Sequence, residues 1–580
     1  MATVTWPILP QEFNQTPLLF AALSTSFRSA TPMFFDQFFE RLSVLSGGIP
    51  ADHLKIAFSV LLTYPYAVIF NNLPNNPQAK HLFSIFITTI TFAWFHELYV
   101  GFIHLITGIL MTYAIMKYNR GKWAPVAVFV LTMAHMSYCH IVRQMEGHLG
   151  DAGFDHTGPQ MVLTMKLTSF AFNVYDGTKL ESKLSEYQRS KQIRTFPSLI
   201  EYMGWALFFG GFLGGPAFEF ADYKNFVDMT VFTVKDEKTG KTKMFKPNGT
   251  VPALRKLGLS FVFVVVLATV APHFNVQAAL KPEWASEAFW KKYIVMRTCD
   301  VYRDTSHHPI VAFSLSLYNH RFLFVQVVSF CVRVKYYIIW LMAEGACILC
   351  GLGFNGYDAK TGTAKWNRVP NIDVVGYETA QNIKELLESW NMRTNVWLKN
   401  YVYLRVTPPG AKPGFLSTLV TFGTSALWHG FHPGYYLTFV TGALLQNTGK
   451  TLRRNLRPLT LTPDLKEALP IKPYYDLLGC LVTHAALNYV VMPFVILSFS
   501  DSIRLWASLL FYTHVGVVVI EAFFRLGGKK YLQGLQKRRV EQAGLQLKEI
   551  PESSKVVVSE MGVPETATEG GVQVGRVKME

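Results

Sequence analysis

Long apolar stretches separated by short polar ones recur along most of this chain. Several are shorter than the ~20 residues that a membrane-spanning helix needs, and short or re-entrant helices are expected where a cavity enters a bilayer. The stretch 322–354 fits either one long helix or a broken pair. The pattern predicts an all-α polytopic membrane protein with about eleven transmembrane helices. The apolar segments are 55–70, 81–95, 100–116, 123–139, 202–218, 257–271, 322–354, 415–431, 435–445, 477–499 and 503–524.

The composition agrees with this pattern. Of 580 residues, 50% are hydrophobic and 16% are charged, whereas soluble domains carry about 25% charged residues. The deficit extends over most of the chain, which favours many membrane helices over a single anchor. We expect an N-terminal region of little membrane character over 1–50, a transmembrane domain over 51–525 and a tail over 526–580.

The net charge of +16 is distributed between the apolar segments. Such a distribution suits cytoplasmic loops facing anionic lipid and attraction of an anionic substrate, and it argues against nucleic-acid binding. Basic groups at Lys529-Lys530 and Lys537-Arg538-Arg539 follow the last apolar segment, so the C-terminus is predicted to be cytoplasmic. The polar end of the tail, beyond about residue 551, is predicted to be disordered.

Two further patterns have plain interpretations. Cys347 and Cys350 form a Cys-x-x-Cys inside an apolar segment, which predicts buried helix packing because no second pair is present to complete a metal site. Asn14 and Asn248 begin tripeptides of the N-glycosylation pattern, which is common by chance, and both are expected to be unmodified.

A polar and aromatic stretch from Trp390 to Tyr436 interrupts the apolar background. Within it, 390–399 is predicted to be helical, and Asn391, Thr394, Asn395 and Leu398 then share one face. Three polar side chains on one stripe suit a wet, inward-facing wall.

His429 lies near the end of the predicted 415–431 helix. An ionisable side chain at membrane depth is costly, so a functional role is the default interpretation, although a single histidine in an apolar helix is more often a packing residue. Asn391 lies 38 residues earlier, which would be about 57 Å along one straight helix. Pro408-Pro409-Gly410 and Pro413-Gly414 break the chain between them, so two separate helices could bring the amide and the imidazole together.

No metal site is expected from sequence. His429 and His432 are three residues apart, but no third ligand follows closely. The other histidines of apolar segments, which include His135, His140, His484 and His514, are interpreted as structural or cavity-lining residues.

Together these stretches resemble the membrane-bound O-acyltransferase (MBOAT) superfamily. Trp428-His429-Gly430, followed by Pro433-Gly434-Tyr435-Tyr436, is similar to the superfamily signature. Other segments resemble its lysophospholipid acyltransferase branch, and the pattern over roughly residues 50–525 is most similar to fungal broad-specificity members. These segments are 165–177, 214–223, 335–337, 353–357, 390–392, 397–399 and 401–405.

The resemblance implies transfer of an acyl group from acyl-CoA to the free hydroxyl of a lysophospholipid such as lysophosphatidylcholine or lysophosphatidylethanolamine. It implies that His429 is the general base, and that Asn391 orients the acceptor or the histidine or stabilises the oxyanion. Acyl-CoA is then a co-substrate, and no permanently bound cofactor or metal is expected. The resemblance also implies that the helices surround a central catalytic tunnel, and Glu219, Asp222 and Tyr223 either line this tunnel or make structural hydrogen bonds. Residues expected to contact substrate are Trp390, Thr394, Asn395, Trp397, Lys399, Tyr403, Arg405, Trp428 and Tyr435.

Two alternatives remain at this point. Within the superfamily, the acceptor could be a sterol, diacylglycerol or protein, and the lysophospholipid-type segments argue against these. From another class, a membrane transporter would also use intramembrane polar residues, but it would not need the pair of Asn391 and His429. The expected location is the endoplasmic reticulum membrane.

Overall fold

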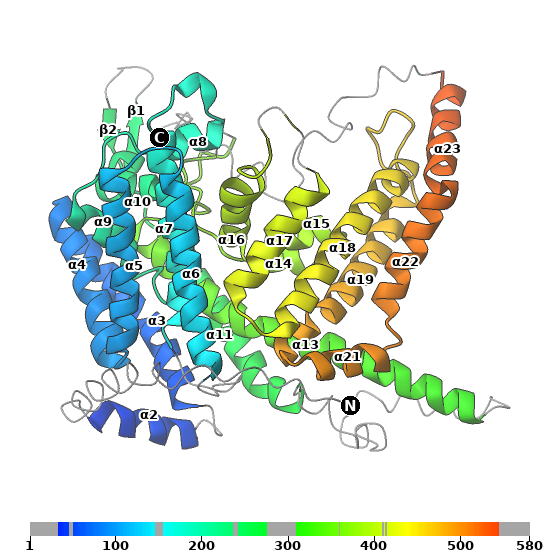
Figure 1. Cartoon of the computed structure of the whole chain (residues 1–580), viewed down its shortest axis with the longest axis horizontal. Coiled ribbons are helices and arrows are strands. Elements are labelled where there is room, and N and C mark those ends of the chain that lie inside the picture. The colour runs from blue at the N-terminus through cyan, green and yellow to red at the C-terminus, as the bar shows by residue number, and fades with distance from the viewer. Residues whose placement is uncertain are drawn as a thin grey trace, which may run out of the picture. The chain divides into compact units, whose positions relative to one another are not determined.

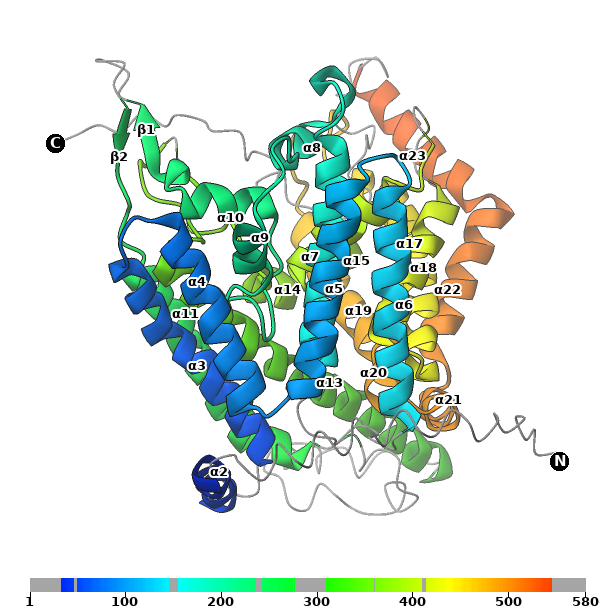
Figure 2. The ribbon, with the colours of Figure 1, turned by 60° about the vertical axis from the view of Figure 1, so that its left-hand side comes forward.

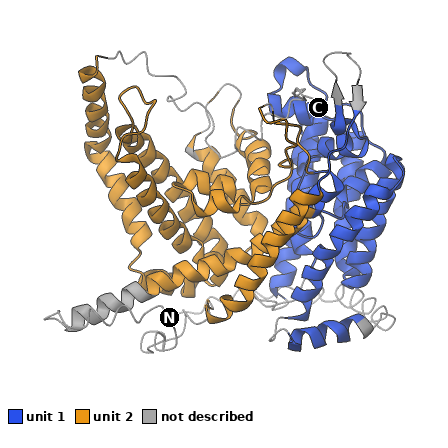
Figure 3. Ribbon diagram, turned by 180° about the vertical axis from the view of Figure 1, so that it is seen from behind, with its two compact units in different colours: residues 1–249, 346–352 blue, residues 250–345, 353–580 orange. Residues whose placement is uncertain are grey.

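The computed structural model of the chain (Figure 1) describes residues 33–45, 50–145, 155–235, 242–274, 276, 309–358, 360–408, 411 and 414–544. The chain forms two compact units: residues 1–249 with 346–352, and residues 250–345 with 353–580 (Figure 3). Both units are built from helices, which confirms the helical fold class. In the described ranges, strands are limited to β1 (Thr233–Lys235) and β2 (Thr242–Met244), which pair antiparallel. Asn14 and the tail beyond residue 544 lie outside the described residues.

In unit 1, residues 1–249 and 346–352, the helices α5 (Tyr99–Tyr118), α6 (Ala124–Met145) and α7 (Thr157–Asp176) run side by side (Figure 2), and α4 (Pro77–Thr89) packs on α9 (Leu199–Ala206). The other elements are α2 (Met33–Leu45), α3 (Ala51–Asn72), η2 (Ile90–Phe95), η3 (Glu181–Lys183), α8 (Glu186–Lys191), α10 (Phe220–Val227) and η4 (Thr230–Phe232).

Two parts of unit 1 differ from the apolar segments predicted by sequence. The prediction that 202–218 is a helix is wrong after Ala206, because turns containing Gly210, Gly211 and Pro216 follow. The helix α7 is absent from the predicted segments because polar side chains interrupt it, yet it is buried over most of its length. The pair Cys347 and Cys350 is buried as predicted, and the Cys347 thiol donates to the Gly210 carbonyl.

In unit 2, residues 250–345 and 353–580, the stretch 322–354 is one unbroken helix as far as Cys350. This helix is α13 (Pro309–Cys350), and its last turn belongs to unit 1. Against α18 (Pro433–Leu456) pack α17 (Phe415–His429), α19 (Lys472–Val490), α20 (Met492–Ile496) and α22 (Tyr512–Phe523). The other elements are α11 (Thr250–Thr269), η5 (Ala271–His273), α14 (Val374–Glu378), α15 (Ile383–Ser389), α16 (Met392–Trp397), η10 (Leu398–Tyr403), η11 (Arg457–Thr460), α21 (Phe499–Ser508), η12 (Phe524–Gly528) and α23 (Lys529–Gln542).

Among the described residues, six helices are long and apolar enough to cross a membrane. A seventh span is possible if the bent pair α21 and 512–542, which meets at 72°, counts as one crossing. The surface supports a lipid environment, since only 11% of the apolar window of Thr250–His273 is buried and its exposed side chains include Leu254, Phe261 and Val265. The multi-pass architecture is therefore confirmed, and the number eleven stays a prediction.

Candidate active site

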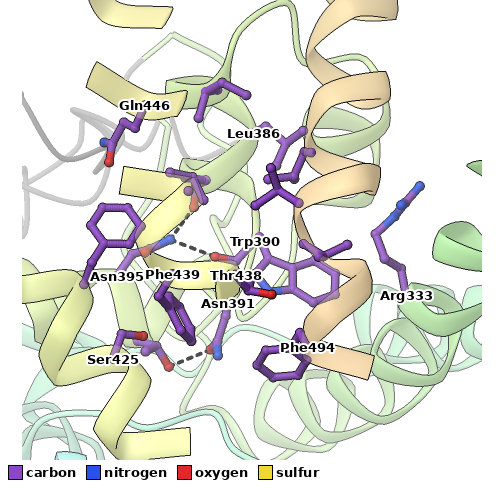
Figure 4. A pocket seen from close by; sticks show the side chains of 18 of the residues that line it. Arg333, Leu386, Trp390, Asn391, Asn395, Ser425, Thr438, Phe439, Gln446 and Phe494 are labelled. Carbon is purple, nitrogen blue, oxygen red and sulfur yellow. Dashed lines mark hydrogen bonds between the residues drawn. The ribbon is translucent and has the colours of Figure 1, made fainter. Parts of the chain in front are cut away.

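A cavity of ≈ 230 Å³ lies inside unit 2, and its wall contains both His429 and Asn391. Figure 4 shows Trp390, Asn391 and Asn395 beside Ser425, Thr438 and Phe439 of the facing helices. Most of the wall is apolar, with a small number of polar groups converging on the space, which is the usual character of a ligand pocket. The elements that contribute to it are α13, α14, α15, α16, η10, α17, α18, α19 and α20.

His429 is the last residue of α17, and aromatic rings surround its half-buried imidazole. Phe439 stacks on it with ring centroids 5.3 Å apart, and Phe494 meets it edge-on at 4.8 Å. Trp428 and Tyr435 lie at 4.7 Å and 5.7 Å. These contacts hold the ring in one place and keep water away from much of it, as a positioned acid–base group requires.

Two glycines make this placement possible. Gly430 has φ of +117°, a conformation that L side chains rarely adopt, and it lets the chain turn sharply after His429. Gly434, at the start of α18, donates its backbone N–H to the Leu497 carbonyl at 2.9 Å. A Cβ on Gly434 would lie 2.0 Å from the Pro493 carbonyl oxygen, so only glycine allows α18 to approach α20 this closely.

Asn391 lies at a helix start rather than inside a helix, so the predicted helix over 390–399 is wrong at its first two residues. The residue has φ of +41° and ψ of 52°, the left-handed region that asparagine tolerates, and α16 begins at Met392. The Asn391 Oδ1 accepts a hydrogen bond from the Thr394 hydroxyl at 2.8 Å. That bond fixes the amide plane on the cavity wall.

Asn395 supports the same turn from one helical turn later. Its side-chain amide donates to the carbonyls of Leu387 and Trp390, the latter at 2.8 Å. Trp390 in turn packs in an aromatic box, with Trp340 at 4.9 Å and Tyr377 at 5.3 Å. These contacts explain why the backbone at Asn391 adopts a left-handed conformation instead of extending the helix.

Two polar side chains of α18 face the cavity without a hydrogen-bond partner in the described parts of the chain. They are the Thr438 hydroxyl and the Gln446 side-chain oxygen, and both atoms are buried. Buried polar groups normally have partners, so a polar substrate group is a natural candidate to satisfy them. On α17, Thr421 and Ser425 precede His429 at four-residue spacing and line the same wall.

A buried charge forms another part of the wall. Arg333 of α13 makes a bidentate ion pair with Glu378 at 3.1 Å and donates to Asn488 Oδ1 at 2.6 Å. The Tyr337 hydroxyl donates to the same carboxylate at 2.6 Å. Sequence reasoning missed this residue, although a charge within the 322–354 apolar stretch is a recognised signal of function or pairing.

The residues predicted to contact substrate divide into two sets. Trp390, Thr394 and Asn395 line the cavity together with the two proposed catalytic residues. The lining set does not include the rest, and Trp397 and Trp428 pack on each other at 6.1 Å in a buried layer beside it. The others outside the lining are Lys399, Tyr403, Arg405 and Tyr435.

Arg405 and Lys399, which do not line the cavity, interact with neighbouring groups of the chain. Arg405 donates through Nε to the Asn400 carbonyl at 3.3 Å. Partial burial lowers the pKa of the Lys399 ammonium, and the nearby Glu388 carboxylate opposes that change.

The acidic residues of the segment 214–223 make structural hydrogen bonds within unit 1. Glu219 accepts from Asn173 at 2.7 Å and from Tyr187 at 2.9 Å. Lys191 donates to both Asp222 oxygens at 2.8 and 2.9 Å, and the Tyr223 hydroxyl contacts the His81 ring nitrogen at 2.9 Å. Of the two roles expected for these residues, the geometry favours the structural one.

Comparison with known proteins identifies the family. The family profile described as MBOAT, membrane-bound O-acyltransferase family, matches residues 144–303 and 305–492. A lysophospholipid acyltransferase of Schizosaccharomyces pombe is 36% identical over 493 residues, which cover 85% of this chain and 90% of the relative. A lysophospholipid acyltransferase of Saccharomyces cerevisiae is 37% identical, with 83% and 75% covered, and human membrane-bound glycerophospholipid O-acyltransferase 1 is 29% identical, with 84% and 92% covered. The chain therefore belongs to the membrane-bound O-acyltransferase family.

Proposed function

We propose that this protein transfers an acyl group from acyl-CoA to the free hydroxyl of a lysophospholipid, with His429 as general base. The observation that carries the proposal is that one cavity of ≈ 230 Å³ has His429, Asn391 and polar side-chain atoms without partners among the described residues in its wall. Relatives named lysophospholipid acyltransferase that are 36% and 37% identical support this acceptor class.

In the proposed reaction, the His429 imidazole takes the proton of the lysophospholipid hydroxyl as its oxygen attacks the thioester carbonyl carbon. The Asn391 amide donates to the oxygen on which negative charge develops, or orients the attacking hydroxyl. The C–S bond then breaks, and the CoA thiolate takes the proton from the imidazolium. The products are a phospholipid and CoA, and no acyl-enzyme forms.

The membrane setting follows from the same proposal. The lysolipid enters laterally from the bilayer, and acyl-CoA enters from the cytoplasmic side. The basic helix α23, which carries Lys529, Lys530 and Arg539, then lies on the cytoplasmic face of the endoplasmic reticulum. Lysophosphatidylcholine and lysophosphatidylethanolamine are the acceptors to examine first.

The test uses purified full-length protein in lipid nanodiscs, a fatty acyl-CoA and a panel of acceptors. We expect phospholipid formation and stoichiometric CoA release from at least one lysophospholipid. His429→Ala should lower turnover by about 10²–10⁴-fold, which is the usual contribution of a general base. The matched control is His432→Ala, because His432 lies three residues later and does not line the cavity.

Two outcomes would contradict the proposal. A folded His429→Ala protein that keeps most of its turnover would exclude His429 as the base. Acyl transfer to a sterol, diacylglycerol or peptide, without transfer to any lysophospholipid, would exclude the acceptor class.

A further inference from the structure

Unit 1 contains a cluster of metal-ligand side chains that the acyl-transfer chemistry does not use. His104 lies on α5, and His135 and Cys139 lie on α6, two helices that run side by side (Figure 2). The His104 Nδ1 and His135 Nε2 atoms are 3.0 Å apart. One ligand atom from each of the three residues lies within 4.8 Å of the other two.

The spacing of these atoms fits a zinc-sized ion. Zinc binds imidazole nitrogen at ~2.0–2.1 Å and thiolate sulfur at ~2.3 Å, so two nitrogens on one tetrahedral ion lie about 3.3 Å apart. The observed 3.0 Å separation therefore needs to open by only a few tenths of an ångström. Cys139 follows His135 by four residues on one helix, which places both side chains on the same face.

Beside the cluster is a small space with a polar wall. A cavity of ≈ 10 Å³ is lined by His104, His135 and Gln160 among others, a volume of about one water molecule. Gln160 is only 4% exposed, and its side chain makes a hydrogen bond with the Cys139 thiol, but its Oε1 has no hydrogen-bond partner among the described residues. A hydrogen-bonded histidine pair accounts for His104 and His135, but it leaves this buried acceptor unexplained.

A third imidazole completes the surroundings. His156, the N-cap residue of α7, stacks on His104 with ring centroids 5.3 Å apart and an interplanar angle of 9°. Its buried Nε2 also lacks a partner in the part of the chain that is described. A Cβ on Gly101 of α5 would lie 2.5 Å from the His156 Cβ, so glycine at this position allows His156 to sit against α5.

We propose that His104, His135 and Cys139 bind one divalent ion of the zinc type, with His156 or a water molecule in the fourth position. Two nitrogens and a thiolate suit zinc and disfavour the hard ions magnesium and calcium, which select oxygen ligands. Binding releases the thiol proton of Cys139, because the thiolate is the ligand. The ion ties α5 to α6, and His156 as the fourth ligand would add the start of α7.

This site is separate from the proposed acyl-transfer site. Its ligands belong to unit 1, whereas the cavity with His429 is lined by residues of unit 2. The three ligands also precede residue 144, where the family match begins. Sequence spacing did not reveal the site, because His104 and His135 come from different helices, 31 residues apart.

The test measures the metal content of the purified full-length protein under reducing conditions by mass spectrometry. We expect about one zinc per chain, and a chelator that removes it should lower the thermal unfolding midpoint. Protein loaded with cobalt(II) should show the absorption of a thiolate-bound, tetrahedral ion. These readouts do not depend on acyltransferase activity.

Variants then locate the ion. Cys139→Ser and His135→Ala should lose zinc, Cys139→His should keep it because imidazole is also a zinc ligand, and the control His140→Ala should match the wild type. Wild-type protein without metal that also takes up no added zinc would overturn the proposal, even if every variant fails to fold. Unchanged zinc content in folded Cys139→Ser and His135→Ala would overturn it as well.

Discussion

Buried polar side chains occur in both units, but one network in unit 1 and two side chains on the cavity wall of unit 2 differ in their hydrogen-bond partners. In unit 1, the fully buried Lys166 ammonium donates to the carbonyls of Trp205 and Ala206 at 2.5 and 3.2 Å, and Glu219 accepts from two side chains. In unit 2, the Thr438 hydroxyl and the Gln446 carbonyl oxygen meet a cavity without partners among the described residues. In the sequence, all four of these residues are polar positions in an apolar background, and nothing there distinguishes the two pairs.

The presence or absence of a protein hydrogen-bond partner separates residues that stabilise the fold from residues that can bind a substrate. A satisfied buried network rigidifies its surroundings, and loss of one member exposes the full desolvation cost of the others. A polar group on a cavity wall that lacks a protein partner can instead form a hydrogen bond with a substrate. Variants of the first kind should therefore lower stability, and variants of the second kind should lower catalysis or substrate affinity.

The largest expected effect in this comparison tests Asn391, which lines the cavity and whose Oδ1 accepts from Thr394. Asn391→Asp keeps the oxygen that accepts from Thr394 and a residue type that tolerates a left-handed backbone, but it removes the amide donor. If that donor stabilises the oxyanion, turnover should fall by about 10²–10³-fold, with little change in the thermal unfolding midpoint. Steady-state CoA release and differential scanning fluorimetry measure the two quantities.

Its matched control is the neighbouring asparagine. The Asn395 amide donates to two backbone carbonyls, so Asn395→Asp places a carboxylate against them and should lower the unfolding midpoint clearly. Asn391→Asp and Asn395→Asp could instead behave alike, with both losing stability or both losing only turnover. Hydrogen-bond partners would then not distinguish catalytic residues from residues that stabilise the fold.

The next effect tests the satisfied network of unit 1. Glu219→Ala removes the charged acceptor of the Asn173 amide and the Tyr187 hydroxyl, and a hydrogen bond to a charged group contributes about 1.5–3 kcal/mol. The unfolding midpoint should fall while the KM for lysophospholipid stays unchanged in the folded fraction. The control is Glu181→Ala, because the exposed pair of Glu181 and Arg194 should contribute at most about 1 kcal/mol. A raised KM without a stability loss would assign Glu219 to substrate binding instead.

The regular parts of the fold were predictable from sequence because one physical cause dominates them. Long apolar runs predicted α3, α5, α6 and α19, since a bilayer-length helix needs little else. The run 202–218 was mispredicted because its glycines allow turns that hydrophobicity alone does not register. The run 503–524 is broken by Leu510 and Phe511, whose positive φ values no residue-type preference suggests.

The candidate site was predictable only in part. The elements that carry Asn391 and His429 are separate, since η10 ends at Tyr403 and α17 begins at Phe415, and both residues line one cavity. The left-handed backbone of Asn391 was not predictable, because spacing at i, i+3 and i+4 fits a helix equally well and the turn depends on tertiary contacts of Trp390. Single hydroxyls such as Thr438 carry no sequence pattern that distinguishes a cavity wall from packing.

The smallest expected effect therefore tests Thr438 itself. Thr438→Val removes a hydroxyl that lacks a partner in the described residues and conserves the side-chain shape, so the unfolding midpoint should stay level or rise slightly. The KM for the lysophospholipid should rise by about ten-fold at most, the equivalent of one hydrogen bond. Thr441→Val is the matched control on α18, because the Thr441 hydroxyl contacts the His514 ring at 3.4 Å and does not line the cavity. It should lower the midpoint and leave KM unchanged. A reversal of these two outcomes would mean that a missing partner does not mark the residues that meet substrate.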